Sequence, residues 1–316
     1  MTTPELGPDP SVVALGGGHG LAASLTALRR ITANLTAVVT VADNGGSSGR
    51  LRGEFGVLPP GDLRMALAAL CGDDRWGQTW ARVLQHRFAS DGELDGHAVG
   101  NLLIVALWEL LGDHVDGLDW VGSLLGARGR VLPMTTAPLD ITARVASTGD
   151  DVVTVRGQVE VATAPGPVLS VHLDPPDPPA CPEVLEAVGR ADWIVLGPGS
   201  WYSSVLPHLL VPDLRGALGS TPARLVVVMN LEPHDDETPE MTAADHFAVL
   251  LQQAPELKID TVLADPASVV DLDRLREEVE VAGARLELAD VAQDDARGQH
   301  DPEKLARAYA RIFMAN

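Results

Sequence analysis

Short apolar runs alternate along this chain with segments of helical periodicity. Residues 11–15 are apolar and lead into Gly16–Gly20, after which Leu21, Leu25 and Leu28 recur at helical spacing. The same alternation predicts further strands at 35–42, 193–196, 225–229, 259–263 and 286–289. It predicts helices at 97–111, 206–210 and 243–253, one that starts near residue 62 and one that starts at Asp301. Strands that alternate with helices form a mainly parallel sheet covered on both faces. The pattern therefore predicts an α/β fold with a three-layer core, and it makes the apolar 97–111 segment a buried central helix.

Residues 131–173 have a different pattern. Three β-type runs, at 141–147, 151–162 and 168–173, are separated by tight turns, which is typical of antiparallel strands. The proline-rich stretch 174–182 cannot join a regular ladder and marks the return to the core. We therefore predict a core made of residues 1–130 and 183–316 and a β-rich inserted lobe at 131–182.

Composition limits the classes of function. A net charge of −21 over 316 residues argues against a surface that binds nucleic acid, which needs many Lys and Arg contacts to phosphates. The chain has two cysteines, which form no metal-ligand spacing and no disulfide framework. Its first residues lack the pattern of a signal peptide, and no apolar run approaches the ~20 residues that span a bilayer. We expect a cytoplasmic protein without membrane insertion.

Two glycine-rich segments follow predicted strands. Gly16, Gly17, Gly18, His19 and Gly20 precede a helix, and Gly197, Pro198, Gly199 and Ser200 precede Ser203 and Ser204. Such loops bring backbone N–H groups and a helix N-terminus to an anionic phosphate, and ligands of parallel sheets bind at the carboxyl ends of the strands. The alternative is that the glycines only form tight turns. Position at strand ends favours binding in both cases.

Residues 38–64 hold the densest set of candidate side chains. Asp43, Asn44, Gly45, Gly46, Ser47 and Ser48 lie beside Arg50 and Arg52, and Asp62 and Arg64 follow on the next helix. Carboxylates with ligand phosphates commonly hold Mg²⁺, so Asp43 and Asp62 are candidate metal ligands and candidate catalytic residues. The competing interpretation makes Asp62 a helix N-cap and Asp43 a turn residue.

Three further polar residues stand near predicted ligand positions. His97 and Asn101 open the 97–111 helix, where His97 either contacts a ligand or supports the helix, and Asn230 ends an apolar strand. His300 and Asp301 precede Pro302, a pattern that favours a helix start over a site.

At these residues the chain resembles the gluconeogenesis factor family of YvcK/CofD-like proteins, in particular its actinobacterial branch. The motifs that carry the resemblance cover most of the chain in family order: VVALGGGHGL, VTVADNGGSSGRLR, LPPGDLRMALAAL, HRF at 86–88, GHAVGNLL, GRVLPMT, ADWIVLGPGSWYSSVLPHLLV and DH at 245–246. The resemblance implies a Rossmann-like core and binding of UDP-sugars such as UDP-N-acetylglucosamine in cell shape, wall synthesis and gluconeogenic growth. The CofD branch of the family transfers a phospholactyl-type group from a guanylyl-activated donor to a deazaflavin, with Mg²⁺ held by aspartates that match the 43–44 pair and Asp62.

The chain departs from the family pattern at four places. Asn44 stands where most members have a second aspartate, and His19 stands where many have threonine. The loop at 235–238 differs in its turn residues, and Gln299 replaces an arginine found before the C-terminal His-Asp in many members.

Our leading hypothesis is a regulator that binds a UDP-sugar. If it uses a metal, we expect Mg²⁺ bound together with the nucleotide diphosphate. Its expected partners are regulatory proteins or further copies of the chain in a homo-oligomer. The alternative is a Mg²⁺-dependent phospholactate-type transferase. The sequence leaves open whether a reaction is catalysed. The candidate ligand-binding residues are Gly16, Gly17, Gly18, His19, Gly20, Asp43, Asn44, Gly45, Gly46, Ser47, Ser48, Arg50, Arg52, Asp62, Arg64, His97, Asn101, Gly197, Pro198, Gly199, Ser200, Ser203 and Asn230.

Overall fold

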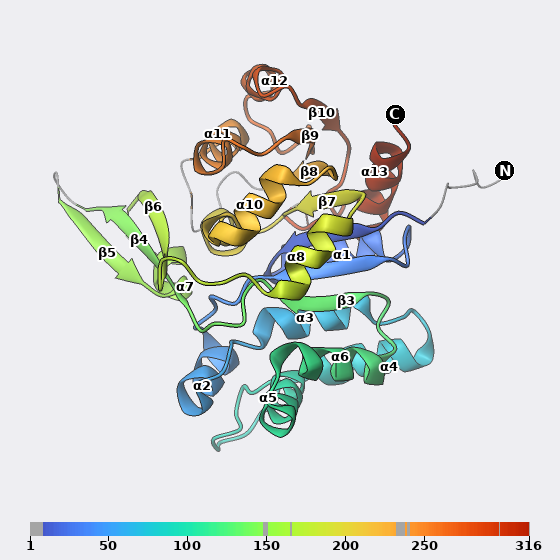
Figure 1. Cartoon of the computed structure of the whole chain (residues 1–316), viewed down its shortest axis with the longest axis vertical. Helices are drawn as coiled ribbons and strands as arrows, with labels where there is room; N and C mark the ends of the chain where they lie inside the picture. The colour runs from blue at the N-terminus through green and yellow to red at the C-terminus, as the bar shows by residue number, and fades with distance from the viewer. Residues whose placement is uncertain are drawn as a thin grey trace.

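The computed structural model describes residues 9–147, 151–164, 166–231, 238, 241–296 and 298–315. Within them the core is a seven-stranded parallel sheet with the strand order β10-β9-β8-β7-β1-β2-β3 (Figure 1). The strands are β1 (Val12–Gly16), β2 (Leu35–Val39), β3 (Arg130–Pro133), β7 (Trp193–Leu196), β8 (Arg224–Val228), β9 (Ile259–Ala264) and β10 (Arg285–Leu288). The central strands are buried along their whole length, as expected for a parallel sheet covered on both faces. The predicted α/β class is confirmed.

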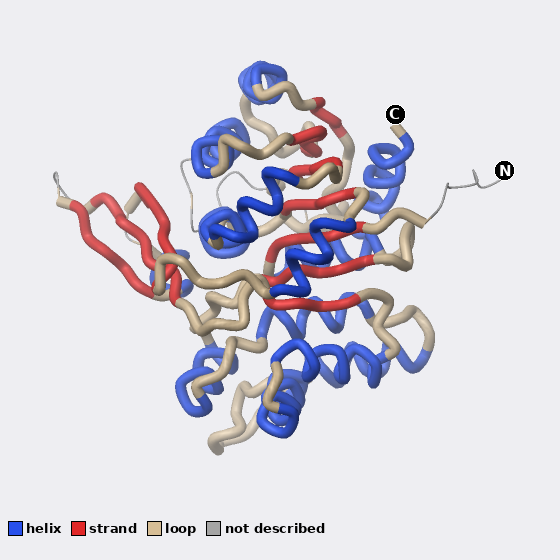
Figure 2. The backbone as a smooth tube through the Cα atoms, in the orientation of Figure 1, coloured by secondary structure: helices blue, strands red, loops and turns tan. Residues whose placement is uncertain are grey.

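Helices cover both faces of this sheet (Figure 2). One face carries α1 (Gly18–Leu28), α3 (Gly61–Leu70) and α13 (Pro302–Met314), and α1 contacts both of the others. The opposite face carries α8 (Pro182–Arg190), α10 (Pro212–Ser220), α11 (Ala243–Gln253) and α12 (Leu272–Val281), and a π-helix η1 (Trp201–Val205) with a short α9 (Pro207–Leu210) precedes α10. Asp301 accepts hydrogen bonds from the backbone N–H groups of Glu303 and Lys304, which confirms it as the N-cap of α13.

The order of the strands reverses at the centre of the sheet. From β1 the chain proceeds to β2 and β3 in one direction, and from β7 it proceeds to β8, β9 and β10 in the other. Neighbouring β1 and β7 are therefore followed by helices on opposite faces, and a crevice forms outside their carboxyl ends. Both glycine-rich segments follow these two strands.

A further helical layer lies outside α3. It consists of α4 (Arg75–Gln85), α5 (Val99–Leu111) and α6 (His114–Leu125), which contact one another and α3. The prediction that 97–111 forms a buried central helix is wrong, because the Leu110 side chain on α5 is 78% exposed. Only one side of α5 packs on the molecule, through Ile104, Val105 and Trp108, so uniform hydrophobicity did not indicate uniform burial here.

The lobe is a three-stranded antiparallel sheet with the order β5-β4-β6, made of β4 (Asp140–Ala146), β5 (Val152–Arg156) and β6 (Val168–Asp174). Two details differ from the prediction. Residues 131–133 belong to β3 of the large sheet, where Val131 and Leu132 are buried beside β2. Residues 158–162 form the helix α7 (Gln158–Ala162), because the strand ends at Gly157, whose φ is +109°. The lobe stands at the carboxyl edge of the large sheet (Figure 1).

The structure also bears on the cysteines and on membrane-spanning helices. Both cysteines, Cys71 and Cys181, are buried and unbridged, in agreement with the absence of a disulfide framework. None of the helices in the described ranges has the length and apolar character to cross a bilayer.

Candidate functional site

The two glycine loops pack against each other at the crevice. A methyl group on Gly20 would overlap the carbonyl oxygen of Pro198, so only glycine allows this approach. Gly18 has a φ of +57° and open space where a side chain would be. The helix α1 begins at Gly18 after an N-cap glycine that supplies no side-chain hydrogen bond. The first turn of α1 therefore presents its backbone to open space beside the second loop.

Asn230 fixes the shape of the second loop. Its Oδ1 accepts a hydrogen bond from the Gly199 backbone N–H at 3.0 Å, and its Nδ2 donates to the Gly199 carbonyl oxygen at 2.9 Å. Ser203, in the π-helix that follows, is 2% exposed, and its hydroxyl has no hydrogen-bond partner among the described residues. The Ser204 hydroxyl lies toward the first loop, 3.3 Å from where a Cβ of Gly17 would be. The structure thus uses Asn230 to hold the loop.

Asp62 lies against the first glycine loop. A Cβ on Gly17 would come within 2.6 Å of Asp62 Oδ2, and the Gly18 backbone donates a hydrogen bond to this carboxylate. The interpretation of Asp62 as an N-cap is wrong, because Pro60 occupies that position of α3 and Asp62 is in the first turn. Burial, and next the negative charge of Asp43, raise the pKa of Asp62 to about 7. Its proton is therefore exchangeable near neutral pH.

Asp43 is the second carboxylate of this pair. Its Oδ1 accepts from the Gly45 backbone N–H at 2.8 Å, and its Oδ2 lies 3.0 Å from where a Cβ of Gly61 would be, next to the Ser48 hydroxyl. No group of three or more His, Cys, Asp or Glu side chains in the described ranges is placed to share a metal ion. Mg²⁺ often takes only one or two protein carboxylates when phosphates supply other ligands. The two carboxylates offer ligands for that role, and a cation would relieve the part of the pKa rise of Asp62 that comes from Asp43, which is smaller than the part from burial.

Asn44 faces the lobe. Its Nδ2 donates to Glu160 Oε2 at 2.9 Å, and its Oδ1 accepts from the Val159 backbone N–H at 3.0 Å, so one amide joins the core to α7. An aspartate here could not donate to Glu160 and would meet it as a like charge. The departure from the family pattern at this position is therefore explained by contact with the lobe.

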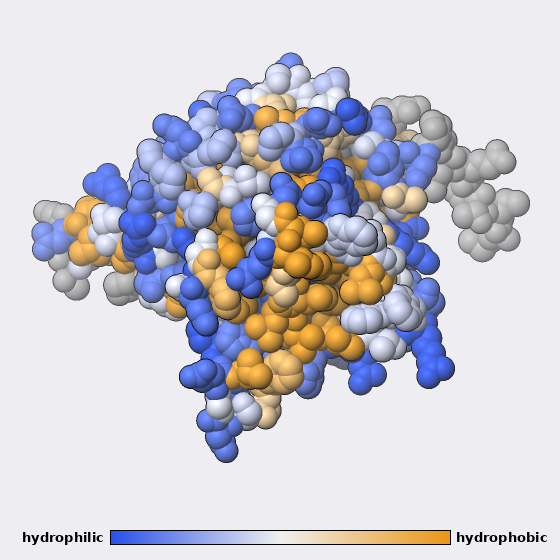
Figure 3. Space-filling model, turned by 60° about the horizontal axis from the view of Figure 1, so that its bottom comes forward, coloured by the Kyte–Doolittle hydropathy of each residue, from blue (hydrophilic) through white to orange (hydrophobic). Residues whose placement is uncertain are grey.

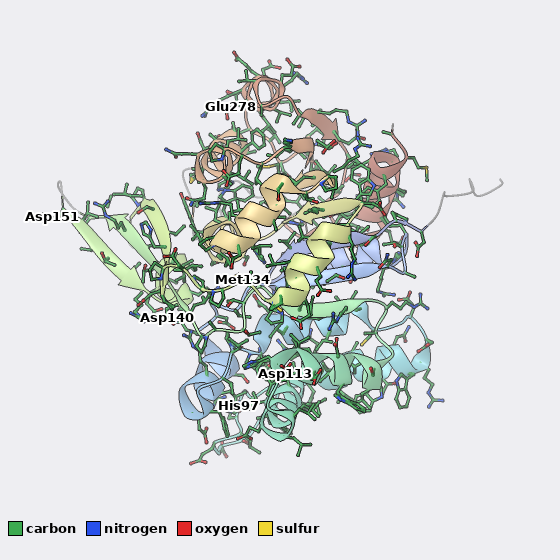
Figure 4. The ribbon with its side chains drawn as sticks, in the orientation of Figure 1. His97, Asp113, Met134, Asp140, Asp151 and Glu278 are labelled. Carbon is green, nitrogen blue, oxygen red and sulfur yellow. The ribbon has the colours of Figure 1, made fainter. Side chains whose placement is uncertain are left out.

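The arginines of the 38–64 segment have different surroundings. Arg50, on α2 (Gly46–Phe55), donates to the carbonyl oxygens of Glu93 and Asp95, at 3.2 and 2.5 Å. Arg52 forms an ion pair of 2.5 Å with Asp140, which lies at the base of the lobe (Figure 4). The guanidinium groups of Arg50 and Arg52 therefore both bind protein groups in this structure.

Arg64 is the arginine that lies with the carboxylate pair. Its side chain is 4% exposed, it donates to the amide oxygen of Gln85, and its Nε has no hydrogen-bond partner among the described residues. Burial, and next the charge of Arg87, lower the pKa of Arg64 to about 10. Arg64 therefore remains cationic at neutral pH near Asp43 and Asp62.

Ser47, His97 and Asn101 form a buried network between α2 and α5. The Ser47 hydroxyl lies 3.1 Å from His97 Nδ1 and accepts from Asn101 Nδ2 at 3.0 Å. All three side chains are nearly inaccessible, and burial lowers the pKa of His97. Figure 4 places His97 near α2 and α5. Asn101 Oδ1 lacks a partner among the described residues. The network positions α2, and its direct role toward a ligand stays a prediction.

A hollow of about 400 Å³ opens beside the first glycine loop. His19 and Gly20 line one side, and Gln299 and His300 line the other. Burial lowers the pKa of His300 to about 4, so its imidazole is neutral at physiological pH. The described part of the 235–238 loop is Thr238, and residues 235–237 lie outside the described ranges.

Thr40 is a member of the site that the sequence analysis did not identify. Its Cγ2 lies 2.6 Å from where a Cβ of Gly17 would be, and its buried Oγ1 has no hydrogen-bond partner among the described residues. Thr40 directly follows β2 and is the last polar residue before Asp43. Its position at the carboxyl end of a predicted strand could have identified it as a candidate site residue.

Together these features define a class: an α/β protein whose crevice, at the reversal of a parallel sheet, combines two glycine loops, a helix N-terminus that begins in glycine and two carboxylates. Residues 12–305 match the family described as 2-phospho-L-lactate transferase CofD, and the chain belongs to this family.

Sequence relatives place it among the gluconeogenesis factors of the family. A Mycobacterium leprae protein named "Putative gluconeogenesis factor" is 47% identical over 98% of this chain and 88% of its own length. The "Gluconeogenesis factor" of Bacillus subtilis is 36% identical over 88% of this chain and 85% of its own length. A crystal structure of a UPF0052 family member from Bacillus halodurans superposes with a TM-score of 0.84 at 32% identity, covering 96% of this chain and all of that one.

Proposed function

We propose that this protein is a cytoplasmic nucleotide-sugar-binding regulator, with a UDP-sugar as ligand, that acts on cell shape, cell-wall synthesis and gluconeogenic growth. The observation that carries the binding proposal is the contact between the two glycine loops at the crevice. It places the first turn of α1, whose N-cap glycine supplies no side-chain hydrogen bond, next to the Gly197–Ser200 loop, and a helix N-terminus favours the negative charge of a diphosphate. The physiological roles are inferred from membership in the gluconeogenesis factor family.

The surroundings of the loops match the parts of such a ligand. Arg64 supplies local positive charge in a protein of net charge −21. The 400 Å³ hollow beside His19 offers space and polar edges for a sugar or nucleoside. Gln299 lines that hollow and carries no positive charge. The negative charge of the diphosphate would therefore be stabilised by the glycine loops instead.

The direct test is calorimetric titration with UDP-N-acetylglucosamine, UDP-glucose and GDP. We expect binding of at least one UDP-sugar and weaker binding of GDP. Because a ligand that binds only the native state raises its apparent stability, thermal unfolding gives a second readout. If none of the three ligands at millimolar concentration gave detectable binding in either measurement, the proposal would be refuted.

Gly18→Ala should weaken binding of the UDP-sugar about tenfold or more. The added methyl group would enter the open space at the first turn of α1, where the proposed diphosphate lies. The matched control is Gly283→Ala, since Gly283 also has a positive φ, +77°, and open space, but follows the C-cap of α12. Both variants carry a similar backbone strain. Equal affinities of the two variants by calorimetry would place the diphosphate elsewhere.

A Mg²⁺-dependent phospholactate-type transferase is the second candidate, favoured by the paired Asp43 and Asp62 and by the family match. Bound Mg²⁺ would supply charge neutralisation to transferring phosphates. Asp43 and Asp62 would hold it, while Arg64 would orient the anionic donor. We expect turnover of a guanylyl-activated phospholactate with a deazaflavin acceptor, lost in Asp62→Asn, if the protein is this enzyme. Nucleotide-sugar binding without turnover would favour the regulator.

A further inference from the structure

One wall of the hollow beside the first glycine loop comes from a single short segment of chain. Residues 290–301 lie between β10 and α13, and their members Gln293 and Gln299 line the hollow opposite the first turn of α1. An antiparallel bridge pairs Ala292 with His300, so the segment folds back on itself. We call its described residues the 290–301 hairpin. The position of this hairpin sets the width of the hollow.

The core holds the hairpin from the side of the sheet. Asp265 directly follows β9 and is buried. Its Oδ2 accepts hydrogen bonds from the backbone N–H groups of Val291 and Ala292, at 2.8 and 3.2 Å. Within the hairpin, the Gln293 N–H donates to the carbonyl oxygen of Gln299 at 2.8 Å. These bonds fix the base of the hairpin to the end of β9.

The hairpin is held from the side of α13 by Lys304. Its Nζ donates to both carboxylate oxygens of Asp290 at 3.0 Å, to the carbonyl oxygen of Ala292 at 2.8 Å and to Asp294 Oδ1 at 2.8 Å. The lysine side chain is 15% exposed, whereas the two aspartate side chains are largely exposed. An ammonium group has three N–H donors, so three residues of the hairpin use all of its capacity.

The helix α13 does not itself explain why a lysine stands at this position. Lys304 is in the first turn of α13, where the helix dipole favours acidic side chains and disfavours a positive charge. Asp301 caps this turn by accepting from the backbone N–H groups of Glu303 and Lys304, which do not depend on the lysine side chain. The side chain of Lys304 therefore stabilises the hairpin and not the helix.

Lys304 also offsets negative charge beside the hollow. Residues 290–301 contain four aspartates and one arginine in a protein of net charge −21. The hydrogen bonds to Asp294 and Asp290 raise the pKa of Lys304, so the ammonium group stays charged throughout the neutral range. Without it, the carboxylates of Asp290 and Asp294 would repel each other and any anionic ligand in the hollow. Both effects would favour an open hairpin.

We propose that Lys304 is a positioning residue of the ligand site, which holds the 290–301 hairpin so that Gln293 and Gln299 meet the sugar or nucleoside of a ligand in the hollow. This inference rests on the proposed function, because it assigns the hollow to part of a UDP-sugar. Ion pairs with exposed carboxylates contribute little to the stability of a whole protein. Loss of Lys304 should therefore change the hairpin and the ligand affinity while the chain stays folded.

Hydrogen exchange of the ligand-free protein tests the hold on the hairpin. Lys304→Met should speed exchange about tenfold or more at the amides of Gln293, Gln299 and Asp301, which are hydrogen-bonded within the hairpin. The matched control is Lys258→Met, which removes the other lysine of the chain, an exposed residue directly before β9, and should leave these amides unchanged. Unchanged exchange at the three amides in Lys304→Met would overturn the proposal.

Calorimetric titration with the UDP-sugar that the wild type binds tests the consequence for the ligand. Lys304→Met should weaken binding about tenfold, and Lys258→Met should bind as the wild type does. Lys304→Arg should stay within about threefold of the wild type, because its guanidinium can donate to the same acceptors. Wild-type affinity in Lys304→Met would contradict the proposal.

A triple variant separates the charge of Lys304 from its packing. Lys304→Met combined with Asp290→Asn and Asp294→Asn removes the repulsion that the lysine offsets, so it should recover most of the lost affinity. A triple variant that bound as weakly as Lys304→Met would show that the charge does not position the hairpin, and the proposal would fail. If the wild type bound no UDP-sugar, the proposed function would fail, and the exchange measurement alone would still decide whether Lys304 holds the hairpin.

Discussion

Gly20→Ala should destabilise the protein by about 2–4 kcal/mol and abolish measurable UDP-sugar binding. The new methyl group would overlap the Pro198 carbonyl oxygen, which belongs to a backbone and cannot rotate away as a flexible side chain could. Relief requires the two glycine loops to separate. Because the proposed diphosphate site needs both loops together, stability and binding should be lost in the same variant. Chemical denaturation and calorimetry measure the two effects.

The control for this prediction is Gly216→Ala. Gly216 lies inside α10, is exposed, and has open space at the position of a Cβ. Alanine in a helix interior is favoured over glycine, so this variant should be about 0.5–1 kcal/mol more stable and bind normally. If Gly20→Ala behaved like Gly216→Ala, the contact between the loops would not control the site.

The parallel core could be predicted from the sequence because its signals are local. An apolar run that ends in glycine sets strand, turn and helix within about ten residues. The strand at 193–196 and the helix at 243–253 have the predicted bounds. The strand predicted at 225–229 lies one residue earlier, at 224–228, and the strand predicted at 259–263 extends one residue further, to 264. The parallel sheet also brought both glycine loops to one edge, as its topology requires.

The roles of individual side chains depended on contacts between distant parts of the chain. Asn44 lies beside Asp43 in sequence but bonds to Glu160, in a lobe helix that the β-type pattern of 151–162 did not indicate. Asp62 precedes an apolar helix, as a capping residue would, yet its carboxylate meets Gly18 on another helix. Local patterns carry no information on such pairings, so the interpretation of both residues required the fold.

The outer layer shows the same limit for hydrophobicity. The run at 97–111 is apolar on all sides, which predicts burial on all sides. Whether a second surface covers its outer side depends on what lies beyond α4, α5 and α6, and one chain supplies no such element in the described ranges. Figure 3, in which the bottom of the molecule comes forward, shows a wide hydrophobic area on this side. Uniform hydrophobicity therefore did not decide the burial of this helix, because the outer side of α5 lies at the surface of the described residues.

The pH dependence of Asp62 should distinguish a metal-bound ligand from a metal-free one. The pKa of Asp62 is raised from 3.8 to about 7 by burial and by Asp43. Between these values the native state keeps a proton that the unfolded state has lost, so the contribution of Asp62 to stability falls as pH rises through this window and is constant above it. Asp62→Asn removes this dependence and should gain stability relative to the wild type from about pH 4 to about pH 7, by at most about 1.4 kcal/mol per pH unit.

Ligand affinity should also depend on whether Asp62 is protonated. Whether affinity rises or falls with pH should depend on whether a metal ion binds with the ligand. A diphosphate bound without a cation is repelled by the ionised carboxylate, so its affinity should fall as pH rises toward 7. A cation requires the carboxylate to be ionised, so binding with Mg²⁺ should strengthen, by up to about tenfold per pH unit, and level off above pH 7. A nucleotide sugar has no phosphomonoester to titrate near pH 6, so either trend reports on the protein.

Calorimetry of the UDP-sugar from pH 5.5 to pH 8, with and without Mg²⁺, measures this coupling. Asp62→Asn should bind with little dependence on pH in both conditions, because the amide does not titrate. The matched control is Asp213→Asn, which changes an exposed carboxylate in the first turn of α10 and should keep the wild-type profile. A wild-type profile that is flat from pH 5.5 to pH 8 in both conditions would show that Asp62 is not in contact with the ligand or its metal.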